Sequence, residues 1–290
     1  MTSVRPFRWD LSRSEGLVHV MPSEPPALPA PEDLRVCAAR VLSLAGDADL
    51  MFVGRSPESL HDYLRGVLHD TAWARRLDLL LFSARGWPLG TIRREYPHAV
   101  TAMRAQFAEA GLAPWQLIRR ARPVVFVDLV ASGDTFGRID ELLVDWSAQL
   151  RLDPRAWRSR VRFVGIVHAQ PSSPNAWRWT QRVDWVHAYP AGSVRNVSVP
   201  WPLWDFLGNR QAKVTPSNPP SRWGDETLLA PPRAESNLVA LHAAARLYEL
   251  GRTDRARFAA LLARQPAMRE SWCRALVRTL RARPEHSPTP

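Results

Sequence analysis

Short apolar runs, separated by segments with helical periodicity, are the feature that most limits how this chain can fold. The runs are rich in leucine, isoleucine and valine, as in strands that are buried on both faces of a sheet. They occupy residues 50–53, 76–82, 123–127, 161–167 and 183–187. Strands that alternate with helices pair in parallel. The sequence therefore predicts an α/β fold with a mostly parallel sheet flanked by helices.

The pattern divides the chain into four regions. We expect residues 1–30 to form an extended N-terminal arm, because the prolines between positions 22 and 31 exclude both helix and central strand. Residues 31–190 form the α/β core, which opens with a helix over residues 32–44. Residues 191–235 are an irregular Trp/Pro-rich segment. We expect residues 236–290 to form three C-terminal helices and a tail. Ser236 is the predicted cap of the first helix, and Gly251 is its predicted end.

Composition excludes several classes of protein. The 290 residues are 46% hydrophobic and contain no run of eighteen apolar residues, so we expect a soluble, cytoplasmic globular protein without a membrane span or secretory signal. The two cysteines, Cys37 and Cys273, lie in helical patterns, and we expect them to be buried free thiols. No Cys or His cluster has the spacing of metal ligands, which excludes a structural zinc site.

The net charge of +11 comes almost wholly from arginine, since Lys213 is the single lysine. This imbalance is typical of a codon-composition bias, but the charge still attracts anions such as nucleotides or sugar phosphates. The arginines are dispersed along the chain, and no zinc-finger, RRM or KH motif is present, so we do not expect a nucleic-acid partner.

The loop that follows residues 123–127 has the composition of a phosphate site. The apolar run stops at Asp128, and Ala131, Ser132, Gly133, Asp134 and Thr135 then lead into a helix. A helix start presents unpaired N–H groups and a positive dipole end, and glycine lets the backbone approach an anion. Ser, Gly, Asp and Thr are also ordinary capping residues, so a plain strand-loop-helix unit is the alternative.

A second loop of the same kind follows residues 50–53. Gly54, Arg55 and Ser56 come after the strand, and Pro57 enters the next helix, with Ser56 as its predicted cap. Arg55 favours an anion site over an ordinary capped helix.

Two further segments are candidates for contacts with a ligand. Residues 83–97 read as a long basic loop that carries Arg85, Arg93 and Arg94. The region after residue 169 is rich in tryptophan, which either packs irregular backbone or stacks on a base. It contains Trp177, Trp179, Trp201, Trp204 and Trp223.

The 128–135 loop resembles the signature of the type I phosphoribosyltransferases, which has a strand, two acids, two apolar residues and a Thr-Thr-Gly-x-Thr-like phosphate loop. Asp128 matches the second acid, whereas Val127 stands in place of the first. The resemblance implies that the chain binds phosphoribosyl pyrophosphate with Mg²⁺ and transfers or releases a base at the anomeric carbon of ribose. It implies that Asp128 binds the ribose hydroxyls and makes Asp134 a possible acceptor for the proton of the incoming nucleophile.

The remaining site residues follow from the same resemblance. Ala131, Ser132, Gly133 and Thr135 would hold the 5′-phosphate, and Gly54, Arg55 and Ser56 would hold pyrophosphate. Residues 83–97 would be the mobile loop that closes over it. The C-terminal helices are a possible surface for homo-oligomer formation.

Two alternatives stay open at this point. Residues 128–136 also resemble the Asp-Thr-x-Gly-Ala-Gly-Asp-Thr-Phe motif of ribokinase-like sugar kinases, which would make Asp134 the base for a sugar hydroxyl and ATP the phosphate donor. That motif belongs near the end of such kinases, whereas here it lies near the middle of the chain. The missing acid at Val127 favours the other alternative, a non-catalytic nucleotide-sensing or partner-binding protein on the same fold.

Overall fold

Five strands form one parallel sheet in the computed structural model, which describes residues 3–12, 26, 28–169 and 178–282. The strands are β1 (Asp49–Val53), β2 (Leu77–Leu80), β3 (Val124–Leu129), β4 (Val161–His168) and β5 (Val194–Val199). Their order is β2-β1-β3-β4-β5, and each neighbouring pair is parallel. The α/β fold with a parallel sheet is confirmed.

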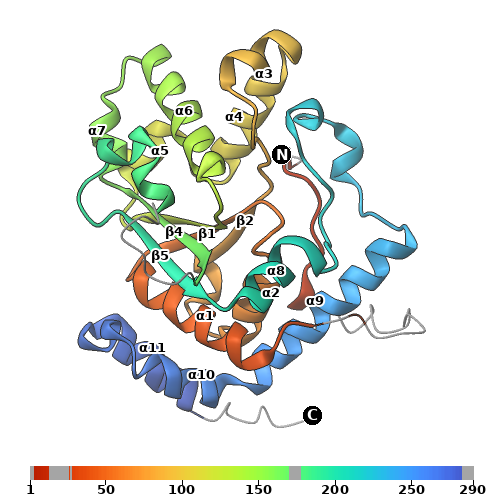
Figure 1. Cartoon of the computed structure of the whole chain (residues 1–290), viewed down its shortest axis with the longest axis vertical. Coiled ribbons are helices and arrows are strands. Elements are labelled where there is room, and N and C mark those ends of the chain that lie inside the picture. The colour runs from red at the N-terminus through yellow and green to blue at the C-terminus, as the bar shows by residue number, and fades with distance from the viewer. Residues whose placement is uncertain (1–2, 13–25, 27, 170–177, 283–290) are drawn as a thin grey trace, which may run out of the picture.

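Helices cover both faces of the sheet (Figure 1). One layer contains α1 (Pro31–Ala45), α2 (Glu58–Val67), α8 (Trp201–Asp205), α9 (Glu235–Thr253), α10 (Arg255–Leu262) and α11 (Ser271–Arg281). The other contains α3 (Leu89–Glu95), α4 (Ala99–Glu109), α5 (Pro114–Arg119), α6 (Asp134–Gln149) and α7 (Pro154–Arg158). The helix after β1 and the helix after β3 therefore lie on opposite faces.

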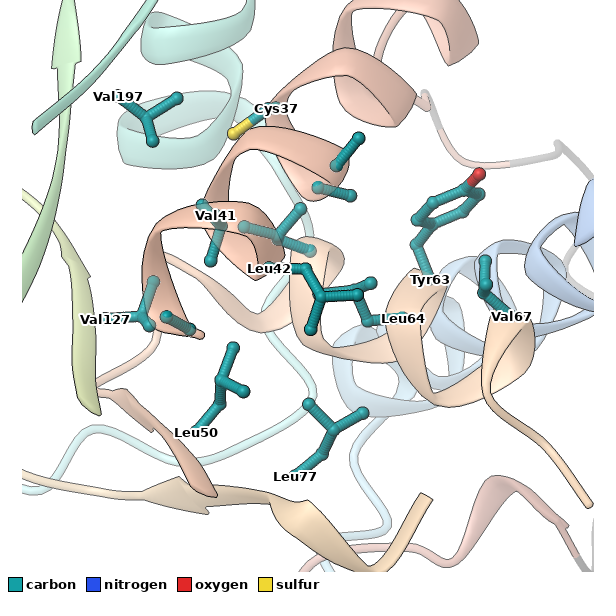
Figure 2. Close-up of a cluster of buried hydrophobic side chains, with 14 of the residues drawn as sticks. Cys37, Val41, Leu42, Leu50, Tyr63, Leu64, Val67, Leu77, Val127 and Val197 are labelled. Carbon is teal, nitrogen blue, oxygen red and sulfur yellow. The ribbon is translucent and has the colours of Figure 1, made fainter. Parts of the chain in front are cut away.

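Alternation along the strands builds two cores. Leu50 and Phe52 of β1 point into the layer that contains α1 and α2, whereas Met51 and Val53 point into the layer with α4 and α6. Figure 2 shows the first of these cores, where side chains of α1, α2 and the strands meet. Full burial of such a side chain is worth about 1.5–3 kcal/mol, so the central strands are fixed by contacts on both faces.

The edge of the sheet differs from the sequence prediction. Residues 183–187 were predicted to be a strand, and this is wrong, because Asp184–Ala188 forms a 3₁₀ helix. The edge strand is β5, which lies beyond residue 190, so the sheet takes in residues that the sequence placed in the Trp/Pro-rich segment. Polar and apolar residues are mixed in β5, and Arg195 and Ser198 are exposed, so it lacks the continuous apolar run of a buried strand.

Helices also replace part of the predicted loop over residues 83–97. Leu89–Glu95 forms α3, which packs on α6. The amide of Leu89 donates a hydrogen bond of 3.2 Å to the Glu141 side chain on α6. The prediction of one long irregular loop is therefore wrong for this part.

The C-terminal region is helical, as predicted, but the bounds of its first helix differ. Helix α9 begins at Glu235, so Ser236 is not its cap, and it continues through Gly251 to Thr253. Gly251 lies against α2, where a side chain would overlap the Tyr63 carbonyl. The glycine marks a close helix contact and not a helix end.

The described part of the N-terminal arm, residues 3–12, crosses the edge strand β2. The Arg5 guanidinium donates two hydrogen bonds of 2.8 Å to Asp78, and Arg8 forms an ion pair with Asp62 of α2. Residues 1–2, 13–25 and 27 of the predicted arm lie outside the described residues.

Two predictions from composition can be compared with the fold. Cys37 and Cys273 are buried free cysteines, as expected. Within the described ranges, none of the helices has the length and apolar character needed to cross a bilayer.

Candidate functional site

A pocket of about 290 Å³ opens at the carboxyl ends of β1, β2 and β3. The chain leaves β1 and β3 toward opposite faces, and such a reversal leaves a crevice where open α/β sheets bind ligands. The structure brings both predicted loops into this pocket. Its walls include Gly54, Arg55, Ser56, Asp128, Ala131, Ser132, Gly133, Asp134 and Thr135, which are the nine residues predicted from the sequence.

The first loop turns sharply at the end of β1. Gly54 has φ +70°, in the left-handed region, and its amide donates a hydrogen bond of 2.8 Å to the Leu80 carbonyl of β2. Arg55 is half-buried, and its guanidinium has no ion-pair partner among the described residues. Ser56 was predicted to cap α2, and this is wrong, because the helix begins at Glu58 with Pro57 in the N-cap position and without a side-chain cap.

The second loop joins β3 to α6. Gly133 precedes the helix with φ +86°, and the Ser132 hydroxyl accepts a long hydrogen bond of 3.4 Å from the Asp134 amide. A Cβ at Gly133 would overlap the indole of Trp179, which is buried. The glycine is thus required by the packing of Trp179 whether or not an anion binds there.

Asp128 is the buried acid of the pocket. It accepts a hydrogen bond of 2.7 Å from the Leu129 amide and another from the Thr135 side chain. Burial raises the pKa of Asp128 to about 7, and these hydrogen bonds and the positive charge of Lys213 oppose the shift. Asp128 can therefore accept or donate a proton near neutral pH.

Val127, in the position of the missing first acid, belongs to the core and not to the pocket. Its side chain is fully buried and belongs to the core that α1, α2 and the strands build (Figure 2). Asp128 is therefore the only carboxylate that β3 contributes to the pocket.

Lys213 and Asn218 are pocket residues that the sequence reasoning missed. They come from the segment after β5 and are more than seventy residues from either loop in the chain. Asn218 donates a hydrogen bond of 2.7 Å to the Leu81 carbonyl at the end of β2. Burial lowers the pKa of Lys213 to about 8. The negative charges of Glu58 and Asp128 oppose this shift, and the positive charge of Arg55 adds to it. The one feature of the sequence that could have pointed to Lys213 is that it is the only lysine.

The basic loop contributes one of its three arginines. Arg85 lines the pocket and is exposed. Arg93 and Arg94 lie on α3 instead, where Arg93 forms an ion pair with Asp145 of α6 and Arg94 contacts Glu95. These two side chains therefore do not line the pocket in this conformation.

The tryptophans divide between packing and the pocket. Trp179 and Trp223 are buried in the core, and Trp223 stacks on Phe82 with ring centroids 5.3 Å apart. Trp204 lines the pocket and stacks on Trp201, which is 54% exposed. Trp177 lies outside the described residues.

The donor set of the pocket bears on the Mg²⁺ that the family resemblance implies. Across the described ranges, no group of three or more His, Cys, Asp or Glu side chains could enclose a metal ion. The pocket has the carboxylates Asp128 and Asp134, and Asp128 is occupied by hydrogen bonds. Mg²⁺ often binds through one carboxylate together with substrate phosphates. These residues fit an ion that enters with a phosphorylated ligand and contacts Asp134.

No family model, curated protein or solved structure matches this chain.

Proposed function

We propose that the pocket binds phosphoribosyl pyrophosphate or a related phosphorylated sugar or nucleotide, and that the protein transfers or releases a base at the anomeric carbon. One observation carries this proposal. Two loops of phosphate-binding composition, more than seventy residues apart in the chain, line one pocket where the strand order reverses. Anions bind at such places because backbone N–H groups and helix dipoles converge there.

The charges of the pocket support an anionic ligand. The pocket is lined by three cationic side chains, Arg55, Arg85 and Lys213, and by two carboxylates, Asp128 and Asp134. Because the pKa of Asp128 is raised to about 7, this acid carries only part of its negative charge near neutrality. The pocket is therefore net positive before a ligand enters.

In the proposed reaction, the bond from the anomeric carbon to pyrophosphate breaks and a bond to the incoming nucleophile forms, through an oxocarbenium-like state. The Arg55 loop would hold the departing pyrophosphate, and Asp128 would orient the ribose hydroxyls. Asp134 would take the proton that the nucleophile loses. Mg²⁺, when bound, would neutralise charge on pyrophosphate. Catalysis would then come from positioning and charge stabilisation.

A second candidate function, binding without catalysis, is favoured by Val127. The core position of this residue leaves the ribose with one protein carboxylate where the family has two. A protein of this kind would sense a phosphorylated sugar or nucleotide.

Calorimetric titration with phosphoribosyl pyrophosphate, pyrophosphate, ribose 5-phosphate and ATP, each with and without Mg²⁺, tests the proposal. We expect Arg55→Ala to lower the affinity for phosphoribosyl pyrophosphate and for pyrophosphate by about ten-fold or more, since a charge-assisted hydrogen bond is worth roughly 1.5–3 kcal/mol. Ribose 5-phosphate should bind the variant nearly as before. Arg119→Ala, at an exposed position on α5, is the control.

The outcomes separate the candidates. Binding of phosphoribosyl pyrophosphate with release of pyrophosphate in the presence of bases supports the enzyme, whereas binding without turnover supports the sensor. Binding of ATP alone supports a kinase. Failure of all four ligands to bind would contradict the proposal.

A further inference from the structure

Lys213 is the one cationic side chain of 39 that is not arginine. A lysine ammonium is a compact point charge that can lose its proton, whereas an arginine is larger and stays charged. The single lysine lies inside the candidate pocket, so its distinct chemistry is available to a ligand there.

The Lys213 ammonium is surrounded by neutral oxygen atoms. Its Nζ donates to the Leu207 carbonyl at 2.9 Å and lies 3.4 Å from the carbonyls of Gly208 and Arg55. Lys213 has no ion pair with a carboxylate in the described part of the chain. A half-buried cation that lines an open pocket and makes no salt bridge within the described residues is a favourable place for an anion.

Neighbouring hydrogen bonds hold Lys213 beside the Arg55 loop. Gln211 donates 2.6 Å to the Ser56 carbonyl and accepts 2.6 Å from the Ser59 hydroxyl. On the other side of the lysine, the amide of Val214 donates to Glu58. The segment is thus tied on both sides of Lys213 to the loop after β1 and the start of α2.

A purely structural role is the alternative, because lysines near a helix end commonly donate to its last carbonyls. Leu207 and Gly208 lie in the helical turn Phe206–Arg210, which fits that role. Two further features favour a ligand contact. The third carbonyl belongs to Arg55 in the predicted pyrophosphate loop, and Lys213 itself forms part of the pocket wall.

We propose that Lys213 is a further ligand-binding residue of this pocket, and that its ammonium binds the pyrophosphate group of the ligand together with Arg55. This inference rests on the proposed function and adds a second cation to Arg55, which is the cation of the predicted pyrophosphate loop. Lys213 gives the site a charge that depends on pH.

Binding should therefore be linked to protonation of Lys213. The charged groups that face Lys213 are Arg55 from the first loop, Glu58 from α2 and Asp128 from β3. Since the pKa of Lys213 is lowered to about 8, a bound anion should raise it again, and binding above pH 8 should take up a proton.

Protection from an amine-reactive reagent tests the inference on the unchanged protein. Acetylation at pH 8 can modify only Lys213 and the α-amino group, and peptide mass spectrometry distinguishes the two. We expect saturating pyrophosphate to slow acetylation of Lys213 at least five-fold and to leave the α-amino group unaffected. Equal rates with and without bound pyrophosphate would overturn the inference.

Titration of variants with pyrophosphate gives an independent test. Lys213→Met should lower the affinity about ten-fold or more. Lys213→Arg should keep most of the affinity at pH 7 but lose the proton uptake at pH 8.5, measured in buffers of different ionisation enthalpy. The protonation of pyrophosphate itself is common to all variants, so the difference between variants reports on the protein. Arg119→Ala, at the exposed position on α5, should retain the Lys213-linked uptake and is the control.

Failure of this inference is distinguishable from failure of the proposed function. If the wild-type protein binds pyrophosphate and folded Lys213→Met binds it equally well, Lys213 is structural and the proposed function stands. If the wild-type protein binds none of the phosphorylated ligands, both proposals fall. Should Lys213→Met not fold, acetylation and Lys213→Arg still decide the question.

Discussion

The Glu58 carboxylate in the first turn of α2 accepts a hydrogen bond of 2.9 Å from the backbone amide of Val214. Glu58 also accepts from the Thr215 hydroxyl and is 2% exposed. One buried acid thus fastens the segment that carries Lys213 to the helix that follows the Arg55 loop.

Replacement of this acid should loosen the wall of the pocket. We expect Glu58→Ala to reduce the free energy of unfolding by roughly 1–3 kcal/mol, because it leaves buried donors unpaired. It should also weaken pyrophosphate binding, since Lys213 loses its fixed position. Urea denaturation and calorimetry measure the two effects. Glu235→Ala, in the exposed first turn of α9, should change neither. Full ligand affinity in Glu58→Ala would show that Glu58 does not position Lys213.

The raised pKa of Asp128 predicts how stability depends on pH. A carboxyl whose pKa rises on folding contributes stability that is complete below its ordinary value of 3.8 and is lost as the pH rises through about 7. Asp128→Asn should therefore change stability little at pH 4 and raise it at pH 8.5 by roughly 1–3 kcal/mol.

Urea denaturation at the two pH values checks this expectation for Asp128. Exposed Asp184→Asn is the control and should show no such difference between pH 4 and pH 8.5. A destabilised Asp128→Asn at pH 8.5 would contradict the prediction.

Restoring the family's first acid should harm this protein. Val127 is fully buried between the sheet and α1, so Val127→Asp places a charge in an apolar core. We expect a loss of about 3 kcal/mol or more, against roughly 1–2 kcal/mol for Val127→Ala, which leaves only a cavity. Thermal and urea unfolding rank the two variants. A stable Val127→Asp with improved binding of phosphoribosyl pyrophosphate would show that the side chain can reach the pocket.

Two glycines set the distance between α2 and α9. A Cβ on Gly66 would overlap the Tyr248 carbonyl, and one on Gly251 would overlap the Tyr63 carbonyl. Either alanine substitution should force the helices apart and cost about 2 kcal/mol or more.

Gly90→Ala in α3 is the matched control for this pair, because no atom lies within 4 Å of its added Cβ. It should stabilise the protein by up to about 1 kcal/mol through helix propensity. Thermal unfolding of the three variants provides the comparison. Equal effects at Gly66, Gly251 and Gly90 would contradict the close packing of α2 and α9.

The sequence was sufficient wherever one local pattern carried the information. Predominantly apolar runs identified β1 to β4, because strands buried on both faces need apolar side chains at most positions. Pro31 and Gly46 identified the limits of α1. The same strand pattern predicted that the loops at Arg55 and Gly133 lie at one edge of the sheet, because a loop that follows a parallel strand lies at the carboxyl ends of the strands.

Tertiary structure decided the elements whose local pattern was ambiguous. Residues 183–187 have an apolar pattern but form a 3₁₀ helix, whereas the mixed pattern of β5 becomes a strand because β4 offers an unpaired edge. Gly251 has the pattern of a helix end, but the closeness of α2 requires it inside α9. In each case the deciding contact comes from residues distant in the chain.

The sequence by itself determined the parallel α/β fold and the two loops, because hydrophobic periodicity and turn chemistry are local properties. Only the tertiary structure decided that Lys213 and Asn218 join those loops and that Val127 faces the core. The direction of a side chain at a strand end depends on the strand's pairing, and the path of the segment after β5 depends on buried hydrogen bonds to Glu58 and Ser56. Such long-range contacts leave no periodic trace in a single sequence.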